Sequence, residues 1–133
     1  MNDMSNLSNA VVSQSLAGRR LENKSVILTG AAGSIGRYIS RHLLREGAKV
    51  TMTGRDPSKL DAFVEELSEE GFDADNITTI VGDCADPQVC RDIVSRALDT
   101  FGKLDVLVNN AGAAGPKYTL RDIPFTDVEM RAA

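Results

Sequence analysis

The sequence contains few of the residues that proteins use to bind nucleic acids. Its 133 residues include no Trp, and aromatic residues account for only 5% of the chain. This scarcity argues against an aromatic platform on which single-stranded bases would stack. Acidic residues outnumber basic ones by 19 to 15, whereas a duplex-binding protein normally presents a basic patch. We therefore expect no nucleic acid partner.

Cysteine and histidine are also scarce. The two cysteines, Cys84 and Cys90, form no Cys-x-x-Cys pair and are too few for a framework of several disulfides. The single histidine, His42, excludes a His-rich metal centre, and the Asp and Glu residues show no recognisable ligand spacing. We therefore predict no metal site, and we interpret His42 as a solvated surface residue.

Long apolar runs are missing as well. A membrane-spanning helix needs about 18 or more apolar residues, and a secretory signal needs a basic start before a shorter apolar stretch. The apolar run at 10–12 stops at Ser13. We therefore expect a cytoplasmic protein, kept reduced, with no membrane partner. We expect residues 1–20, rich in Ser and Asn near their start, to form a flexible lead-in.

From residue 21 onward, short apolar runs alternate with segments of helical periodicity. The predicted strands are Ser25–Thr29, Lys49–Thr53, Ile77–Val81 and Leu104–Val108. Alternation of this kind predicts an α/β fold, in which right-handed crossovers join the strands of a parallel sheet. Four strands with their crossovers make about half of a doubly wound Rossmann domain. We therefore expect residues 21–133 to be an incomplete domain of a longer polypeptide.

Helices are expected between these strands. Two of them begin at Asp-Pro pairs (56–57 and 86–87), in which Asp caps the helix and Pro takes its first position. Glycines at 47, 71 and 102 follow the expected helix ends. A capping box, Thr126-x-x-Glu129, predicts a further helix near Thr126. The apolar residues expected to face the sheet are Ile35, Ile39 and Leu43 in the first helix; Leu60, Phe63, Val64 and Leu67 in the second; and Cys90, Ile93, Val94, Ala97, Leu98 and Phe101 in the third.

A glycine-rich turn, Thr29–Gly36, joins the first strand to the first helix. Gly30 permits a tight turn, Gly33 can adopt backbone angles closed to other residues, and Gly36 lets helix and strand pack closely. The N–H groups of the first helical turn and the helix dipole then favour a pyrophosphate. A tight turn without a ligand is the alternative. The strand-to-helix position of the turn favours a dinucleotide site.

Two further segments combine with this turn. Asp83 follows the third strand, and Asn109-Asn110-Ala111-Gly112 follows the fourth. Together with Thr29–Gly36 they resemble the short-chain dehydrogenase/reductase family, and the resemblance covers roughly Leu21 to the end of the chain. The combination is much more specific than any one motif. It implies an oxidoreductase that acts on a small-molecule carbonyl substrate and forms a homo-oligomer in the intact protein.

The resemblance also implies roles for individual residues. The turn would hold the cofactor diphosphate, Asp83 and the backbone of Cys84 would hold the adenine ring, and Ala111 and Gly112 would line the cofactor. Asn109 would brace the strand. Ser34 stands where the family's commonest turn has Gly, and its hydroxyl can itself donate to a phosphate.

The residues after the second strand bear on the choice of cofactor. A dinucleotide-binding fold that prefers NAD places Asp or Glu about 20 residues after the glycine-rich turn, at the end of the second strand, where the carboxylate binds the ribose 2′-hydroxyl. Here Gly54 and Arg55 occupy that region, and Asp56 is expected to be a helix cap. The Arg55 guanidinium suits a phosphate, so we predict NADP (NADPH) rather than NAD. The alternative is a solvated Arg55 and NAD. The complete set of predicted cofactor-binding residues is Thr29, Gly30, Gly33, Ser34, Ile35, Gly36, Arg55, Asp83, Cys84, Asn109, Ala111 and Gly112.

The family's catalytic set does not occur in this sequence. The family reduces carbonyls with a Ser and a Tyr-x-x-x-Lys pair. Tyr38 is followed four residues later by His42, and Tyr118 by Asp122. We therefore predict no catalytic residue, and we expect this segment to bind cofactor without turnover.

The amino-acid sequences of three segments point to one group of enzymes within this family. Residues 52–55, 109–117 and 120–126 are similar to the N-terminal part of the bifunctional malonyl-CoA reductases. In those enzymes this part reduces malonate semialdehyde to 3-hydroxypropionate with NADPH. Two alternatives stay open: a non-catalytic dinucleotide-binding module, and a fragment of a sugar-nucleotide epimerase or dehydratase. The last is favoured only by the glycine spacing at 30, 33 and 36.

Overall fold

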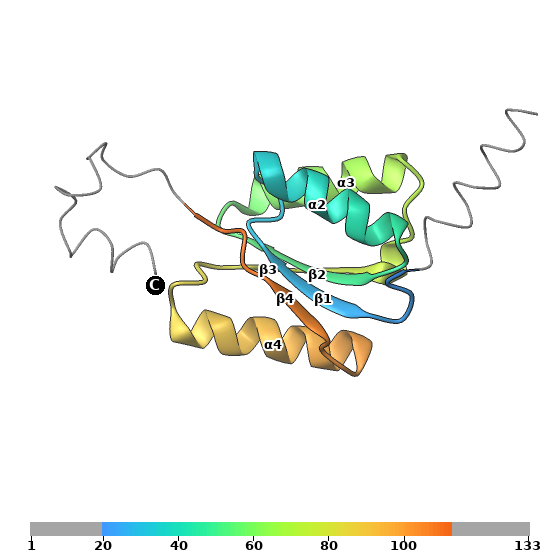
Figure 1. Cartoon of the computed structure of the whole chain (residues 1–133). Coiled ribbons are helices and arrows are strands. Elements are labelled where there is room, and N and C mark those ends of the chain that lie inside the picture. Colours follow the sequence, from blue (N-terminus) through green and yellow to red (C-terminus); the bar gives the residue numbers. More distant parts are fainter. Residues whose placement is uncertain (1–19, 113–133) are drawn as a thin grey trace, which may run out of the picture.

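The computed structural model describes residues 20–112. They form a parallel sheet in the order β3-β2-β1-β4, with helices α2 and α3 on one face and α4 on the other (Figure 1). This arrangement confirms the predicted α/β Rossmann fold. The predicted lead-in, apart from Arg20, and the predicted helix near Thr126 lie outside the described residues. The elements are β1 (Ser25–Thr29), α2 (Ser34–Arg45), β2 (Lys49–Gly54), α3 (Pro57–Glu69), the short 3₁₀ helix η1 (Ala74–Asn76), β3 (Ile77–Val81), α4 (Pro87–Phe101) and β4 (Val106–Val108).

Strand β1 lies at the centre of the molecule. It pairs in parallel with β2 on one side and with β4 on the other. All five of its residues are buried. Because side chains alternate along a strand, Val26 and Leu28 join the core under α2 and α3, whereas Ile27 joins the core against α4. The predicted fourth strand is shorter than expected, since it begins at Val106.

Helix α2 buries a different face from the one that its apolar spacing predicts. Gly36, Ser40 and Leu44 are its buried residues, while the side chain of Ile35 is 67% exposed. Ile39 and Leu43 are only partly buried, at the edge of the core. Small residues face the sheet because the helix approaches it closely at Gly36. The buried hydroxyl of Ser40 is satisfied, since it donates to the Gly36 carbonyl at 2.8 Å.

Helix α4 buries less than its apolar stripe predicts. Only Ile93 and Ala97 are buried, while Val94 and Leu98 are 40% and 44% exposed. Leu107 of β4 is also exposed. The helix packs on β1, β2 and β3, and the described residues supply no element beyond β4 to cover its remaining apolar side. In α3, by contrast, three of the four predicted residues are fully buried, namely Leu60, Phe63 and Leu67.

An arginine–carboxylate cluster joins α2 to α3. The guanidinium of Arg41 donates to Glu66 at 2.7 Å and to both carboxylate oxygens of Glu70 at 2.8–3.2 Å. Arg37 also pairs with Glu66, and both arginines lie over the buried ring of Phe63. The hydrogen bond from Arg41 lowers the pKa of the Glu70 carboxyl below its ordinary value. The cluster therefore fixes α2 beside α3, and the stems of the arginines cover Phe63.

Candidate functional site

The N-terminus of α2 differs from the starts of the other helices in the described part of the chain. Asp56 caps α3 by accepting from the N–H groups of Ser58 and Lys59, and Asp86 caps α4 by accepting from the N–H of Gln88. Helix α2 follows Gly33 and has no side-chain cap. Its first N–H groups lack partners within the helix, and they lie at the positive end of the helix dipole. This end of α2 therefore suits an anion.

The backbone around this N-terminus is very close-packed. A Cβ added to Gly36 would collide with the Gly30 carbonyl oxygen and would lie 2.9 Å from Cα of Ala31. Gly30 itself has a φ of 63°, and a Cβ there would lie 3.1 Å from Cα of Ala111. Both glycines therefore play the parts that the sequence predicts. Gly30 makes the tight turn, and Gly36 allows α2 to approach β1.

The reason predicted for Gly33 is wrong. Its φ of −78° and ψ of 174° are ordinary extended values that any residue adopts. A Cβ there would meet only the Gly30 carbonyl oxygen, at 3.4 Å, which is ordinary van der Waals contact. The turn is closed instead by its backbone, because the N–H of Gly33 donates to the Gly30 carbonyl at 3.2 Å. Gly33 leaves the helix N-terminus without a side chain over it.

The hydroxyl of Thr29 ties the ends of β1 and β4 together. It accepts from the N–H groups of Asn110 and Ala111, both at 2.9 Å, and it donates to the Val108 carbonyl at 3.5 Å. Thr29 is buried, so these bonds are protected from water. They hold the segment after β4 directly beside Gly30. Thr29 and Ala111, both predicted from sequence, are thus brought together.

Asn110 is a residue of this site that the sequence analysis did not select. Its side-chain Nδ2 donates to the Gly30 carbonyl at 3.2 Å, so it braces the two segments. The sequence assigns the bracing role to Asn109, whereas the structure shows this contact at Asn110. Alternation along β4 carries a signal for the correct residue. Val108 packs against the core under α2, and the residue two positions later should continue on that face.

The remaining predicted residues follow the ends of β2 and β3. The N–H of Gly82 donates to the Gly54 carbonyl at 3.0 Å, which draws these two ends together. Arg55 is exposed just after β2, and no atom lies within 4 Å of a Cβ added to Gly54. Asp56 is occupied as a helix cap, as predicted.

The turn after β3 is held by one of its own side chains and by one from α4. The carboxylate of Asp83 accepts from the N–H of Ala85 at 3.0 Å, and the carbonyl of Cys84 accepts from the thiol of Cys90 at 3.0 Å. Cys84 is half-buried against the smaller core under α4. Thr29 ends β1, and the other predicted site residues follow the carboxyl ends of parallel strands, the edge at which open α/β sheets bind ligands (Figure 1).

Other kinds of site find no support in residues 20–112. No cluster of three or more potential metal ligands occurs among them. His42 is exposed on α2, as predicted. In this part of the chain no helix has the length and apolar character needed to cross a membrane.

Known proteins resemble the chain along most of its length. A family model described as short chain dehydrogenase matches residues 24–130. A 7alpha-hydroxysteroid dehydrogenase of Bacteroides fragilis is 36% identical over 111 residues, which are 84% of this chain and 40% of that protein. The chain spans two fifths or less of the length of the first curated relatives that it matches.

Solved structures give the same result. The N-domain of a bacterial malonyl-CoA reductase with NADP is 41% identical, with a TM-score of 0.68, over 74% of this chain and 18% of that one. A short-chain dehydrogenase/reductase from Brucella melitensis is 31% identical, with a TM-score of 0.72, over 85% of this chain and 44% of that one. The resemblance to the malonyl-CoA reductases inferred from sequence is thus confirmed as a similarity.

Proposed function

This chain belongs to the short-chain dehydrogenase family, and from that premise we propose that it is the NADPH-binding portion of an oxidoreductase that reduces a carbonyl to an alcohol. The observation that carries the proposal is the uncapped N-terminus of α2, set between Gly30 and Gly36. Its free N–H groups supply donors for a diphosphate, and the missing side chains leave room for it. A bound nicotinamide would supply the hydride.

Each predicted residue has a part in this proposal. Thr29 fixes the turn, and the backbone from Gly30 to Gly36, with Gly33, Ser34 and Ile35, binds the diphosphate. The adenine ring would lie against Asp83 and the backbone of Cys84, and Ala111 and Gly112 would line the cofactor with Asn109 beside them. The fit is supported by the position of all these residues at one edge of the sheet. Asn110 positions this lining through its bond to Gly30.

Arg55 is proposed to select NADP over NAD. Its guanidinium is exposed at the end of β2, next to the open space at Gly54, and the only nearby carboxylate of the β2–α3 turn is committed to capping α3. A 2′-phosphate would gain a bidentate partner there, whereas a ribose 2′-hydroxyl would find no free carboxylate. We expect Arg55→Asp to weaken NADPH binding about tenfold relative to NADH binding, because the phosphate then faces a like charge. Equal preference in the variant and the parent would contradict the assignment.

The substrate proposed for the intact protein is malonate semialdehyde, reduced to 3-hydroxypropionate. The support is the 41% identity with the malonyl-CoA reductase N-domain. Residues 21–133 would then be the first part of its Rossmann domain, behind the lead-in of residues 1–20, in a cytoplasmic homo-oligomer. We expect the present segment to bind cofactor without turnover, because neither Tyr in its sequence is followed by Lys four positions later.

The test is a titration of the chain with NADPH, followed by the fluorescence of the nucleotide. Ser34→Asp places a negative charge in the first turn of α2, where the diphosphate would lie, and should weaken binding about tenfold or more. Ser58→Asp is the matched control, since it makes the same change in the first turn of α3. Both positions are exposed, so both variants should fold. Equal losses in the two variants, or none in Ser34→Asp, would refute the site.

A further inference from the structure

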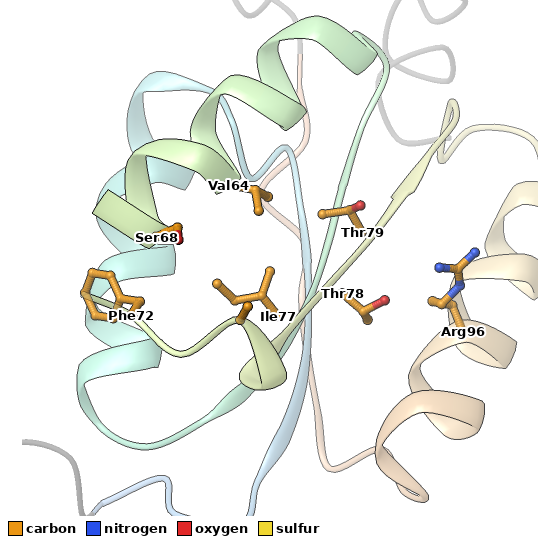
Figure 2. Close-up of a pocket in the computed structure, with 8 residues that line it drawn as sticks. Val64, Ser68, Phe72, Ile77, Thr78, Thr79 and Arg96 are labelled. Atoms are coloured by element: carbon orange, nitrogen blue, oxygen red, sulfur yellow. The ribbon is translucent and has the colours of Figure 1, made fainter. Parts of the chain in front are cut away.

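A groove lies along the outer edge of β3, between α3 and α4 (Figure 2). It has a volume of about 270 Å³. Val64 and Ser68 of α3 line one side, the side chains of Thr78 and Thr79 lie along the strand, and Arg96 of α4 closes the other side (Figure 2). The groove therefore spans both faces of the sheet at its edge.

The edge that the groove exposes is suited to pairing with another strand. Among the described residues β3 pairs only with β2, so one side of it presents unpaired backbone N–H and C=O groups. The strand Ile77–Val81 contains no charged residue and no Pro, the residues that discourage pairing at a sheet edge. An extended peptide can use such an edge as a template.

The charge of the groove indicates what such a peptide should carry. Within residues 20–112, Arg96 is the only charged residue that lines the groove, and no carboxylate there lies in ion-pair contact with its guanidinium. The wall opposite Arg96 carries no charge and presents the apolar side chains of Phe72 and Val64 beside Ser68 (Figure 2). A strand that lies in the groove would thus place apolar side chains toward α3 and a carboxylate toward α4, because alternate side chains point to opposite faces.

A second copy of this chain fits the groove less well. Two β3 edges that pair antiparallel are related by a two-fold axis perpendicular to the sheet, which keeps α4 of both copies on the same face. Arg96 lies beside the middle of β3, so the two guanidinium groups would face each other across the axis. A small carboxylate would pair with Arg96 but would leave the row of backbone groups along β3 to water. The second copy would bring like charges together, and the small carboxylate would leave the strand edge unpaired.

We propose that the β3 edge groove is a docking site for an extended, acidic peptide segment of a partner protein. The peptide adds a strand to the sheet beside β3 and pairs a carboxylate with Arg96. The groove lies against Ile77, at the start of β3, and Phe72, whereas the cofactor residues follow the carboxyl ends of the strands. The proposal is therefore independent of the proposed function, and the peptide should bind with or without nucleotide.

The experiment measures fluorescence anisotropy of labelled peptides added to the whole chain. One peptide alternates Val and Thr and carries a central Glu. A second peptide has the same sequence with Lys in place of this Glu. We expect the Glu peptide to bind about tenfold more tightly than the Lys peptide, because a charge-assisted bond is gained. Arg96→Glu, at an exposed position, should reverse this preference, while Arg91→Glu on the same helix should leave it unchanged.

Backbone pairing is tested with two forms of the Glu peptide that are N-methylated on alternate sets of residues, so that each form lacks the N–H donors of one edge of the peptide strand. The form without donors on the edge that faces β3 should lose binding, and the other form should keep it. The proposal is overturned if neither charged peptide binds, if both methylated forms bind equally, or if Arg96→Glu leaves the preference as it was. It is also overturned if the chain forms dimers that a Thr79→Cys variant cross-links while the parent, with only Cys84 and Cys90, does not, because the occupant is then a second copy.

Discussion

The starts of α2 and α3 solve the same physical problem in opposite ways. The first turn of every helix leaves N–H groups without partners inside the helix. In α3 the carboxylate of Asp56 accepts from two of them, at 2.9 and 3.3 Å. In α2 the corresponding position is Gly33, which has no side chain to offer. The comparison shows that a side-chain cap uses up the first-turn N–H groups of a helix, whereas a helix without such a cap keeps these N–H groups available for an anion.

The second difference between the two starts is the space around them. At α2 the chain is folded so tightly that a Cβ on Gly36 would overlap the Gly30 carbonyl. At α3 the neighbouring Gly54 has nothing within 4 Å of an added Cβ. The close packing at Gly36 lets α2 approach β1, whereas Gly54 faces open space, so the two glycines provide matched positions for mutation.

The largest expected effect is that of Gly36→Ala. Alanine normally stabilises a helix relative to glycine by about 1 kcal/mol, but here its Cβ would push α2 away from β1. We expect overpacking to dominate and the free energy of unfolding to fall by about 2–3 kcal/mol, measured by urea denaturation. Gly54→Ala is the control and should change stability by less than about 0.5 kcal/mol. Equal effects of the two substitutions on stability would contradict the difference in packing between Gly36 and Gly54.

Gly33→Asp should convert the start of α2 into a copy of the start of α3. The φ and ψ of Gly33 allow Asp, so its carboxylate can cap the helix and stabilise the chain by a few tenths of a kcal/mol. The same carboxylate would occupy the N–H groups and repel a diphosphate, so NADPH should bind about thirtyfold more weakly, measured by fluorescence titration.

The reverse change provides the control. Asp86→Ala removes the cap of α4 and should cost about 1 kcal/mol of stability without altering the affinity for NADPH. A Gly33→Asp variant that is better capped and still binds NADPH as the parent does would show that the open N-terminus is not the binding site.

The smallest expected effect concerns the ion pairs that hold α2 beside α3. Hydrogen bonding from Arg41 lowers the pKa of Glu70 in the folded chain, so this carboxylate stabilises the fold above its unfolded pKa. That stabilisation is lost as the pH falls below about 4.5, the ordinary value for Glu. Glu70→Gln should therefore lower the melting temperature at neutral pH and make it less sensitive to acid. Glu69→Gln, at an exposed neighbouring position, should leave the acid sensitivity unchanged, and identical profiles for both would contradict this role.

Local signals in the sequence predict most of the scaffold. The Asp-Pro pairs locate the starts of α3 and α4, and both aspartates make the predicted cap bonds. Gly47, Gly71 and Gly102 all have positive φ just after the helices that they were expected to end. These features are predictable because each depends on residues close together in the chain.

Features that depend on contacts between distant segments were not predictable in the same way. Apolar spacing selects Ile35 as a buried residue of α2, but the close approach at Gly36 rotates the small residues inward and leaves Ile35 exposed. The doublet at 109–110 does not itself show which Asn faces Gly30; the signal lies only in alternation from Val108, and the structure identifies Asn110. Val94 of α4 belongs to an apolar stripe, yet it is exposed because no described element covers it.

The most direct measurement follows the backbone amides themselves by NMR, in isotope-labelled chain titrated with NADPH. If the diphosphate binds at the open helix start, the amide resonances of Ser34, Ile35 and Gly36 should shift strongly. The first-turn amides of the capped helices, Ser58 and Gln88, should stay in place. Unmoved resonances at Ser34–Gly36, or equal shifts at all three helix starts, would contradict the account.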